Sequence, residues 1–392
     1  MKIYITGYGL ISAIGVGEKE TLDALKNERS GIATGKKEET KAYKVGEIAL
    51  SNEELKTKYK LRTDGSRTAL LGMVAAKQAF EGHLISDEIK TGLISGTSVG
   101  GMDISEQEYR NYLNNENHNP ENYKHHSSGV SSDQIAEELG INDFINTIST
   151  ACSSAANALM MGARMIRSGM LDRVVVGGTD SLTSFTISGF KSLMIFDADW
   201  CKPFDNSRKG LNLGEGAGYI VLESEKSLAI TKKQPVAQLT GWSNASDAFH
   251  QTASSPDGQG AQLSMLEALK VAGLKPTDID YINAHGTATP NNDLSESQAI
   301  KSVFKEVIPP FSSTKAFTGH TLAASGGIEA VFAILAINNG LLYPNLNFSE
   351  VIEETQLTPQ LSFEEGKTVK HVLSNSFGFG GNNSTVILSR VD

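Results

Sequence analysis

The chain has 392 residues, of which 39% are hydrophobic and 20% charged, so it is too long for one simple core and we expect two lobes. Its net charge of −10 argues against nucleic acid as the main partner. No apolar run approaches the roughly 20 residues of a membrane span, so we expect no membrane association. Two distant cysteines give no disulfide framework and favour a reducing, cytoplasmic compartment.

Alternating strand and helix signals run through the first half of the sequence. Short β-branched runs predict strands, and amphipathic runs with polar caps predict helices. Two polar stretches, 36–60 and 106–132, are interpreted as surface loops. The predicted elements, in order, are a strand at Lys2–Thr6, a helix at Glu18–Asn27, a helix at Ser66–Phe80 capped by Thr63 or Asp64, a strand at Thr91–Ser95 with a turn at Gly96–Gly101, a strand at Phe144–Thr150, a helix up to Ser168 and a strand at Arg173–Val176.

Cys152 stands at a strand-to-helix junction in the sequence STACSSAANAL. Small neighbours, among them Ala151 and Ser153, leave room for another group to reach the sulfur. Free N–H groups and the helix dipole favour a thiolate at a helix N-terminus. A buried structural cysteine is the competing interpretation, and this stretch alone does not decide between the two.

The sequence pattern recurs in the second half. Leu84 and Thr97, for example, recur as Leu274 and Thr287, 190 positions later. In both places an amphipathic helix leads through a loop into a strand and a Gly-Thr turn. We therefore predict two similar α/β halves, 1–230 and 231–392, each containing a mixed, largely parallel sheet.

Two histidines lie in glycine-rich turns of the second half. His285 lies in NAHGTATP and His320 in STKAFTGH. If the halves are related by pseudo-symmetry, matching element ends meet between them, and Cys152 faces both histidines. Neutral imidazoles beside a cysteine can position a thioester and stabilise negative charge on a carbonyl oxygen.

Three further features accompany these histidines. Lys315 is placed to orient the His320 ring or to stabilise nearby charge, and Glu329, in the first turn of a helix predicted at 327–338, can supply a hydrogen bond. The glycine-rich run SNSFGFGGNN, ending at Asn383, follows a strand. Its glycines let the backbone approach a ligand closely, so its N–H groups are candidates for an oxyanion hole.

TACSSAANAL, NAHGTATP, STKAFTGH and SNSFGFGG occur in this order, and together they resemble the β-ketoacyl-acyl-carrier-protein synthases of the elongating Cys-His-His type. ITGYGLIS, ISGTSVGG and PFDNSRKGLNLGEGAG also resemble stretches of that family, so the likeness runs from Ile3 to about Leu388. The resemblance implies a thiolase fold, with two pseudo-symmetric βαβαβαββ halves forming a five-layer αβαβα arrangement. It also implies a homodimer.

The resemblance implies a decarboxylative condensation. An acyl chain moves from acyl carrier protein to Cys152, malonyl carrier protein loses carbon dioxide, and the chain grows by two carbons. No metal or cofactor is implied, since phosphopantetheine arrives on the carrier. The implied roles are Cys152 as nucleophile, His285 and His320 as malonyl-binding groups, Lys315 and Glu329 as their support, the Cys152 and Phe379 N–H groups as oxyanion hole with the Phe379 ring as gate, Thr287 and Thr289 as phosphopantetheine contacts, Val99, Phe204 and Phe377 as substrate-pocket residues, and Arg208 as carrier contact.

Several departures from the family pattern leave the pathway open. The stretch between Gly101 and Cys152 is shorter than in housekeeping fatty-acid enzymes. Leu211-Asn212 replaces a more aromatic and aliphatic pair, and Asn382 stands where threonine is usual. The Leu211-Asn212 pair and Asn382 flank the expected acyl pocket and gate. A polyene or polyketide ketosynthase, paired with a chain-length subunit, is therefore the alternative to a fatty-acid enzyme.

Other classes of protein fit less well. An initiating synthase would carry asparagine where His320 stands, and a non-catalytic chain-length subunit would lack Cys152. A lone GxG at Gly7 is too weak for a dinucleotide fingerprint. Cys201 has no base near it in sequence and is interpreted as structural. His118, His125 and His126 are interpreted as solvated loop residues and not as metal ligands.

Overall fold

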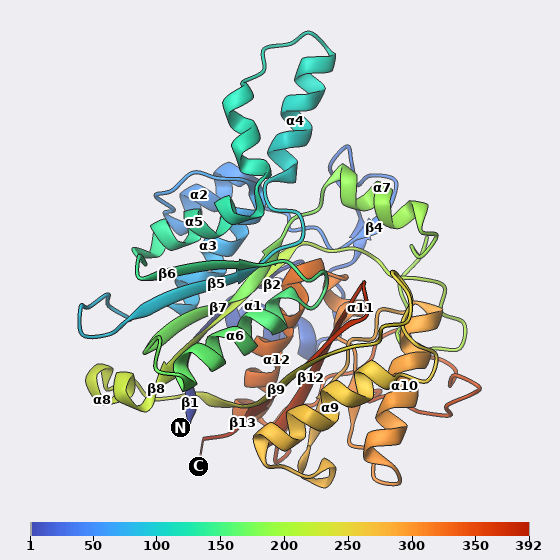
Figure 1. Cartoon of the computed structure of the whole chain (residues 1–392). Coiled ribbons are helices and arrows are strands. Elements are labelled where there is room, and N and C mark those ends of the chain that lie inside the picture. Colours follow the sequence, from blue (N-terminus) through green and yellow to red (C-terminus); the bar gives the residue numbers. More distant parts are fainter. Residues whose placement is uncertain (1, 392) are drawn as a thin grey trace.

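The computed structural model describes residues 2–391, in which eleven strands form one large sheet (Figure 1). Ten of them follow the spatial order β11-β10-β12-β13-β9-β1-β8-β7-β5-β6, and β2 (Gly15–Val16) pairs with β1 at its side. The ten strands are β1 (Ile3–Ser12), β5 (Thr91–Gly96), β6 (Phe144–Ile148), β7 (Arg173–Asp180), β8 (Gly216–Ser224), β9 (Ala237–Ser246), β10 (Tyr281–Asn283), β11 (Phe311–Ser312), β12 (His371–Gly378) and β13 (Asn382–Ser389).

The sheet repeats one pairing pattern twice. From β1, the partners β8 and β7 follow antiparallel, and β5 and β6 follow parallel. From β9, the partners β13 and β12 follow antiparallel, and β10 and β11 follow parallel. Antiparallel pairings thus equal parallel ones in each set, and the predicted predominance of parallel pairing is wrong. The sequence pattern did not reveal that β8 and β13 return antiparallel beside the strand before them.

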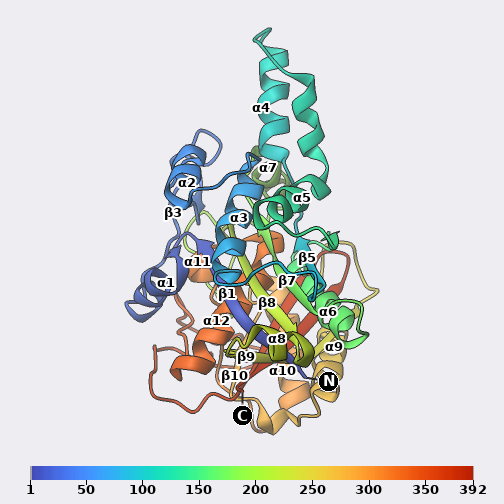
Figure 2. The ribbon, with the colours of Figure 1, turned by 90° about the vertical axis from the view of Figure 1, so that its left-hand side faces the viewer.

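Helices cover the strands in five layers (Figures 1 and 2). Helix α3 (Arg67–Ala79) packs on the outer face of β1, β7 and β8, and α9 (Gln259–Ala272) packs on β9 and β13. Between the two strand sets lie α6 (Ser154–Arg167), which contacts β7 and β13, and α12 (Ser325–Asn339), which contacts β8 and β12. This is the predicted αβαβα arrangement.

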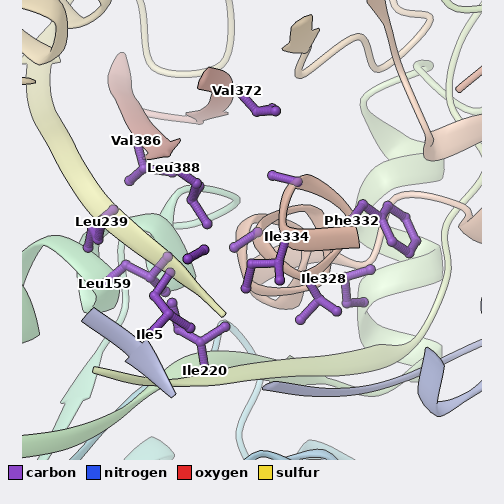
Figure 3. Close-up of a cluster of buried hydrophobic side chains, with 14 of the residues drawn as sticks. Ile5, Leu159, Ile220, Leu239, Ile328, Phe332, Ile334, Val372, Val386 and Leu388 are labelled. Atoms are coloured by element: carbon purple, nitrogen blue, oxygen red, sulfur yellow. The ribbon is translucent and has the colours of Figure 1, made fainter. Parts of the chain in front are cut away.

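Helix α12 is buried on every side except at its C-terminal end, because strands and α6 surround it. Figure 3 shows Ile328, Phe332 and Ile334 of this helix among apolar side chains from both strand sets. By length and composition alone the segment Leu322–Asn339 could cross a membrane, which the sequence did not lead us to expect, but 89% of it is buried inside the protein.

The central layer depends on close backbone contacts at two glycines. A Cβ atom added at Gly218 of β8 would lie 2.3 Å from the backbone nitrogen of Ile328. A Cβ at Gly327 of α12 would lie 2.3 Å from the Gly218 carbonyl oxygen. No side chain fits at either position, so these glycines let the first turn of α12 rest directly on β8.

Several predicted boundaries need correction. β1 does not end at Gly7 but continues through a bulge there. Ser66, and not Thr63 or Asp64, caps α3, because its hydroxyl accepts the Ala69 N–H. β6 ends at Ile148 and not at Thr150, and it is a half-buried strand at the edge of the sheet.

Both predicted surface loops contain helices. The stretch 36–60 holds α2 (Asn52–Tyr59), which begins with a capping box between Ser51 and Glu54. The stretch 106–132 holds most of α4 (Met102–Leu113), the 3-10 helix η1 (Pro120–His126) and the start of α5 (Ser128–Leu139). These helices are rich in polar residues, and α4 projects from the body of the protein in Figure 2, so a core-facing apolar stripe was not there to reveal them.

The remaining elements are short or lie at the periphery. They are α1 (Gly17–Lys26), β3 (Ala33–Thr34), β4 (Lys44–Val45), α7 (Ser184–Ser192), α8 (Glu225–Thr231), η2 (Pro276–Asp278), α10 (Pro290–Phe304), α11 (Lys315–Thr318) and η3 (Leu322–Ala324).

Candidate active site

Cys152 lies in the tight turn between β6 and α6 and is 5% exposed. The residue before it, Ala151, has φ of +52°, a left-handed conformation that non-glycine residues seldom adopt. The Ser154 hydroxyl closes the turn, since it accepts the Thr150 N–H at 2.9 Å and donates to the Ala151 carbonyl at 2.6 Å. The sequence between strand and helix therefore holds the cysteine in one strained, fixed turn.

His320 meets this cysteine from the second half of the chain. Its Nε2 lies 3.0 Å from Cys152 Sγ, and its Nδ1 lies 3.1 Å from the Ser325 hydroxyl at the start of α12. The His320 backbone pairs with the 212–214 segment through hydrogen bonds of 2.7 and 2.9 Å. The His285 ring stands edge-on to that of His320, with centroids 5.5 Å apart. The predicted convergence of the three side chains is confirmed.

Glu296 fixes the His285 turn, and the sequence analysis missed it. Its buried carboxylate accepts the His285 and Gly286 N–H groups, both at 2.8 Å, and the Asn375 side-chain amide at 3.0 Å. Burial raises its pKa to about 7, although these hydrogen bonds act in the opposite direction. Glu296 lies on α10, six residues beyond the end of NAHGTATP, and no local pattern indicated that its side chain turns back to the His285 turn.

A second buried carboxylate, that of Asp180, was missed for the same reason. It accepts the Thr97 hydroxyl at 2.7 Å and the Ala323 N–H at 2.9 Å. It thereby joins the Gly-Thr turn after β5 to the segment between His320 and α12. Burial raises its pKa to about 6.

A buried ion pair lies close to the two histidines. Lys315 Nζ lies 2.5 Å from Glu329 Oε1, and both side chains are 3% exposed. Burial lowers the pKa of both His285 and His320 well below the usual value, and the Lys315 charge lowers it further. Both imidazoles are therefore neutral at physiological pH.

Burial also raises the pKa of the Cys152 thiol, to about 12, against a smaller opposing effect of Lys315. The expected preference for a thiolate at the helix N-terminus is therefore overridden in the resting protein. Cys152 and His320 form a neutral thiol–imidazole pair.

A cleft of about 260 Å³ opens onto these side chains. Of the predicted site residues, it is lined by Cys152, His285, Thr287, Thr289, His320, Phe377 and Phe379. The Thr287 and Thr289 hydroxyls are hydrogen-bonded to each other at 2.9 Å. Lys315 and Glu329 lie close to the histidines but outside the lining.

Phe379 belongs to the glycine-rich loop between β12 and β13. Its ring stacks on that of Phe190, with centroids 5.7 Å apart. The preceding Gly378 lies against the nucleophile turn, where an added Cβ would be 3.3 Å from the Cys152 nitrogen. The loop thus brings the Phe379 backbone beside that of Cys152.

Two family models match this chain: β-ketoacyl synthase, N-terminal domain, over residues 1–227, and β-ketoacyl synthase, C-terminal domain, over residues 236–349. The chain belongs to the β-ketoacyl synthase family. It is 30% identical over 409 residues to 3-oxoacyl-[acyl-carrier-protein] synthase 2 of Staphylococcus aureus, covering 100% of this chain and 99% of the relative. It is 32% identical over 409 residues to the protein of the same name from Synechocystis, covering 99% and 98%.

Solved ketosynthases share the fold of this synthase. The ishigamide ketosynthase/chain length factor superposes with a TM-score of 0.92 at 28% identity, covering 100% of this chain and 99% of that chain. The ketosynthase ApeO, solved in complex with its chain length factor ApeC from Xenorhabdus doucetiae, gives a TM-score of 0.86 at 30% identity, covering 100% and 98%.

Three predicted substrate residues of the synthase do not line the cleft. Val99 belongs to an adjoining apolar cluster that includes Leu211, which does line it. Phe204 supports the His285 turn, because an added Cβ at Gly286 would lie 2.6 Å from its ring. The half-buried Arg208 guanidinium donates to the Asp205 and Pro290 carbonyls at 2.9 and 2.8 Å, and its role as a carrier contact stays a prediction.

The departures from the family pattern fall into two groups. Leu211 lines the cleft, as expected. Asn212 instead accepts the Cys201 N–H at 2.7 Å and donates to the Asp197 and Asp199 carbonyls. Asn382 contacts Ser153, next to the nucleophile. The two asparagines stabilise loops and do not line the cleft, which the sequence alone did not reveal.

Alkylation of the synthase by iodoacetamide tests the neutral resting state. Because the thiol pKa is raised to about 12, the Cys152 thiolate fraction is expected to rise about tenfold per pH unit between about pH 7 and 10. Peptide-resolved mass spectrometry in a Cys201→Ser background gives the rate. A rate that is already constant near pH 7 would instead show a stabilised thiolate.

Proposed function

We propose that this protein is a β-ketoacyl-acyl-carrier-protein synthase that lengthens an acyl chain, held as a thioester on Cys152, by two carbons of malonyl carrier protein. The observation that carries the proposal is the meeting of one cysteine and two neutral histidines in a single cleft. The names of the curated relatives support fatty-acid synthesis as the setting.

In the first proposed step, the Cys152 sulfur attacks the acyl thioester of the carrier. His320 Nε2, 3.0 Å away, accepts the thiol proton as the new bond forms. The bond between the acyl carbon and the carrier sulfur then breaks, and that sulfur receives the proton. The N–H groups of Cys152 and Phe379 are the proposed donors to the tetrahedral oxyanion.

In the second step, malonyl carrier protein loses carbon dioxide and leaves an enolate. Nε2–H groups of both histidines would hold its oxygen. His285 Nδ1 is buried without a hydrogen-bond partner among residues 2–391, which favours placing the ring proton on Nε2, since an orphaned buried N–H is the rarer defect. His320 accepted the thiol proton at a bare Nε2 in the first step and returned it to the carrier sulfur, so before the second step its ring proton exchanges from Nδ1 to Nε2 through solvent. The Ser325 hydroxyl, 3.1 Å from Nδ1, can accept from Nδ1–H in the first step and donate to the bare Nδ1 in the second.

In the third step, the enolate carbon attacks the thioester on Cys152. The new carbon–carbon bond forms, the Cys152–acyl bond breaks, and the released thiolate takes a proton from water. The step needs no cofactor in this protein, because the carbanion equivalent comes from decarboxylation. We propose that phosphopantetheine enters only on the carrier, along Thr287 and Thr289.

A polyene or polyketide ketosynthase is the alternative. The chemistry would be the same, and two of the solved relatives are ketosynthases with chain length factors. Leu211 is the departure that reaches the cleft, so it bears directly on the acyl chain accepted. Turnover of saturated, unsaturated and aromatic acyl carriers distinguishes the two settings.

We propose a homodimer, supported by an unpaired strand edge and a group of exposed large side chains. β6 is a half-buried strand at the sheet edge, and Tyr109, Tyr112 and Leu113 of the projecting α4 are each more than half exposed. Sedimentation is expected to give twice the 42.0 kDa chain mass. A monomer that dimerises only with a chain-length subunit would contradict the homodimer and favour the alternative pathway.

We also propose a cytoplasmic location, supported by the free thiols of Cys152 and Cys201 and checked by cell fractionation.

Variants of Cys152 test the proposed reaction. Cys152→Ala is expected to abolish condensation, because no acyl acceptor remains. Cys152→Gln is expected to retain malonyl decarboxylation, because His285 and His320 still hold the enolate oxygen. Radiolabelled acyl transfer and carbon dioxide release measure the two activities. A folded Gln variant that releases no carbon dioxide would remove the histidines from that role, and intact protein that never takes up label would favour a non-catalytic subunit.

Lys209 is the proposed carrier contact at the cleft. It is the one charged side chain among the lining residues, and the neighbouring Arg208 lies outside the lining with its guanidinium hydrogen-bonded to two carbonyls. Lys209→Glu is expected to lower kcat/KM for acyl carrier protein about tenfold while changing that for an N-acetylcysteamine thioester less than about twofold. Lys202→Glu, outside the lining, is the matched control. Equal losses on both substrates would exclude Lys209 from carrier binding.

A further inference from the structure

Asn382, which departs from the family pattern, has hydrogen-bonding partners in two parts of the fold, β9 and the start of α6. It begins β13, three residues after Phe379. Its Oδ1 accepts from Asn244 Nδ2 of β9 at 2.6 Å and from Asn157 Nδ2 of α6 at 3.0 Å. It also lies 2.8 Å from the Ser153 hydroxyl, whose single hydrogen it shares with the Thr150 carbonyl at 2.7 Å. None of these side chains belongs to the proposed catalytic set.

The hydrogen bonds continue into a connected polar network. Asn157 Oδ1 accepts the Ser384 hydroxyl at 2.8 Å and Asn244 Nδ2 at 3.1 Å, and Asn157 Nδ2 donates to the Thr150 hydroxyl at 2.8 Å. Ser153, Asn157 and Ser384 are buried. Buried polar groups that satisfy one another in this way rigidify a single arrangement.

This network joins the two backbone segments that carry the proposed oxyanion hole. On one side is the turn from Thr150 to Ser153, which contains the strained Ala151 and the Cys152 N–H. On the other is the Phe379 loop, whose Gly380 and Gly381 have φ of +83° and +73°. The loop connects β12 and β13 as a hairpin closed by the Gly378–Asn382 pair, so the sheet fixes its base, while its glycines leave the tip conformationally free unless other contacts hold it.

The other backbone hydrogen bonds of the loop lead away from the nucleophile. Gly380 donates to the Gln251 carbonyl at 2.7 Å, and the Gly381 carbonyl accepts the Asp247 N–H at 2.9 Å. Asn382, by contrast, leads to Ser153, the residue that follows Cys152. Its amide oxygen accepts two side-chain N–H groups and lies within hydrogen-bonding distance of the Ser153 hydroxyl.

We propose that Asn382 is a positioning residue that sets the Phe379 N–H against the Cys152 N–H, and so fixes the oxyanion hole. The inference deepens the proposed function and rests on it. Misplacement of such donors by about 1 Å can cost roughly 100-fold in rate, whereas the enolate is held by His285 and His320, which lie outside this network. The network therefore serves the steps at the Cys152 thioester and not decarboxylation.

Two variants of Asn382 test this division. Asn382→Leu removes the acceptor at similar volume, and Asn382→Asp keeps it. The Leu variant is expected to lower acyl transfer to Cys152 and overall condensation by about 10- to 100-fold. In a Cys152→Ala background, it should leave malonyl decarboxylation within about twofold. The Asp variant should recover most of the acyl transfer, which a loss of packing alone would not predict.

Asn339→Leu is the matched control, because its side chain bonds only to the Leu335 carbonyl at the far end of α12. If Asn382→Leu does not fold, Asn382→Ala takes its place. An equal fall in decarboxylation and acyl transfer would show general loosening and overturn the proposal, as would unchanged acyl transfer.

Hydrogen–deuterium exchange separates this inference from the proposed function, because it needs no turnover. Exchange of the backbone between Phe379 and Gly381 is expected to quicken in Asn382→Leu and not in the control. Unchanged exchange would overturn the coupling even if the enzyme is active. If exchange is faster in Asn382→Leu but the wild-type protein transfers no acyl group, the result would count against the proposed function alone.

Discussion

The contact between Gly218 and Gly327 is the constraint on which the rest of the site depends. Each glycine occupies space in which the Cβ of another residue would lie 2.3 Å from backbone atoms of the other element. Because α12 can lie directly on β8, its first turn brings Ser325 to the His320 ring and Glu329 to Lys315. A methyl group at either glycine would move that turn by more than the tolerance of a 3.0 Å contact between His320 and Cys152.

The same close packing determines the electrostatics of the site. Removing water raises the thiol pKa and lowers both imidazole pKa values, so burial favours neutral groups throughout. A buried Lys315–Glu329 pair is costly, and apolar replacements of such pairs are often neutral or stabilising. The Lys315 charge of this pair disfavours imidazolium, so it keeps both rings available as neutral hydrogen-bond donors.

Sequence reasoning found the residues that stand in glycine-rich turns and missed those that hold the turns from a distance. Cys152, His285 and His320 each lie in a short run of small residues at the end of a predicted helix or strand. Such a run can be recognised in the local sequence. Glu296 and Asp180 sit within or beside ordinary elements and act only through tertiary contacts. The resemblance placed Arg208 at a carrier contact, and the structure adds that its guanidinium donates to two carbonyls. Side-chain direction of this kind is not encoded in local pattern.

The layer order could be inferred from the recurring pattern, because repeated α/β units bury their faces in few ways. Helices α2 and α4 could not, since helices rich in polar residues at the periphery lack the apolar stripe on which periodicity depends. The capping box of Ser51 and Glu54 was the one available signal for α2.

The unpaired edge of the sheet, at β6, lies close to the Cys152 turn. β6 ends at Ile148, and the Cys152 turn follows directly, so whatever pairs along that edge also bears on the nucleophile turn. An unpaired strand edge leaves backbone donors and acceptors exposed. Pairing with a second subunit would satisfy them and brace the Cys152 turn from the outside, as the Asn382 network braces it from within. Assembly and catalysis would then share one short segment of backbone, which gives a physical reason for a ketosynthase to act as a dimer, whether the second subunit is a copy of itself or a chain-length partner.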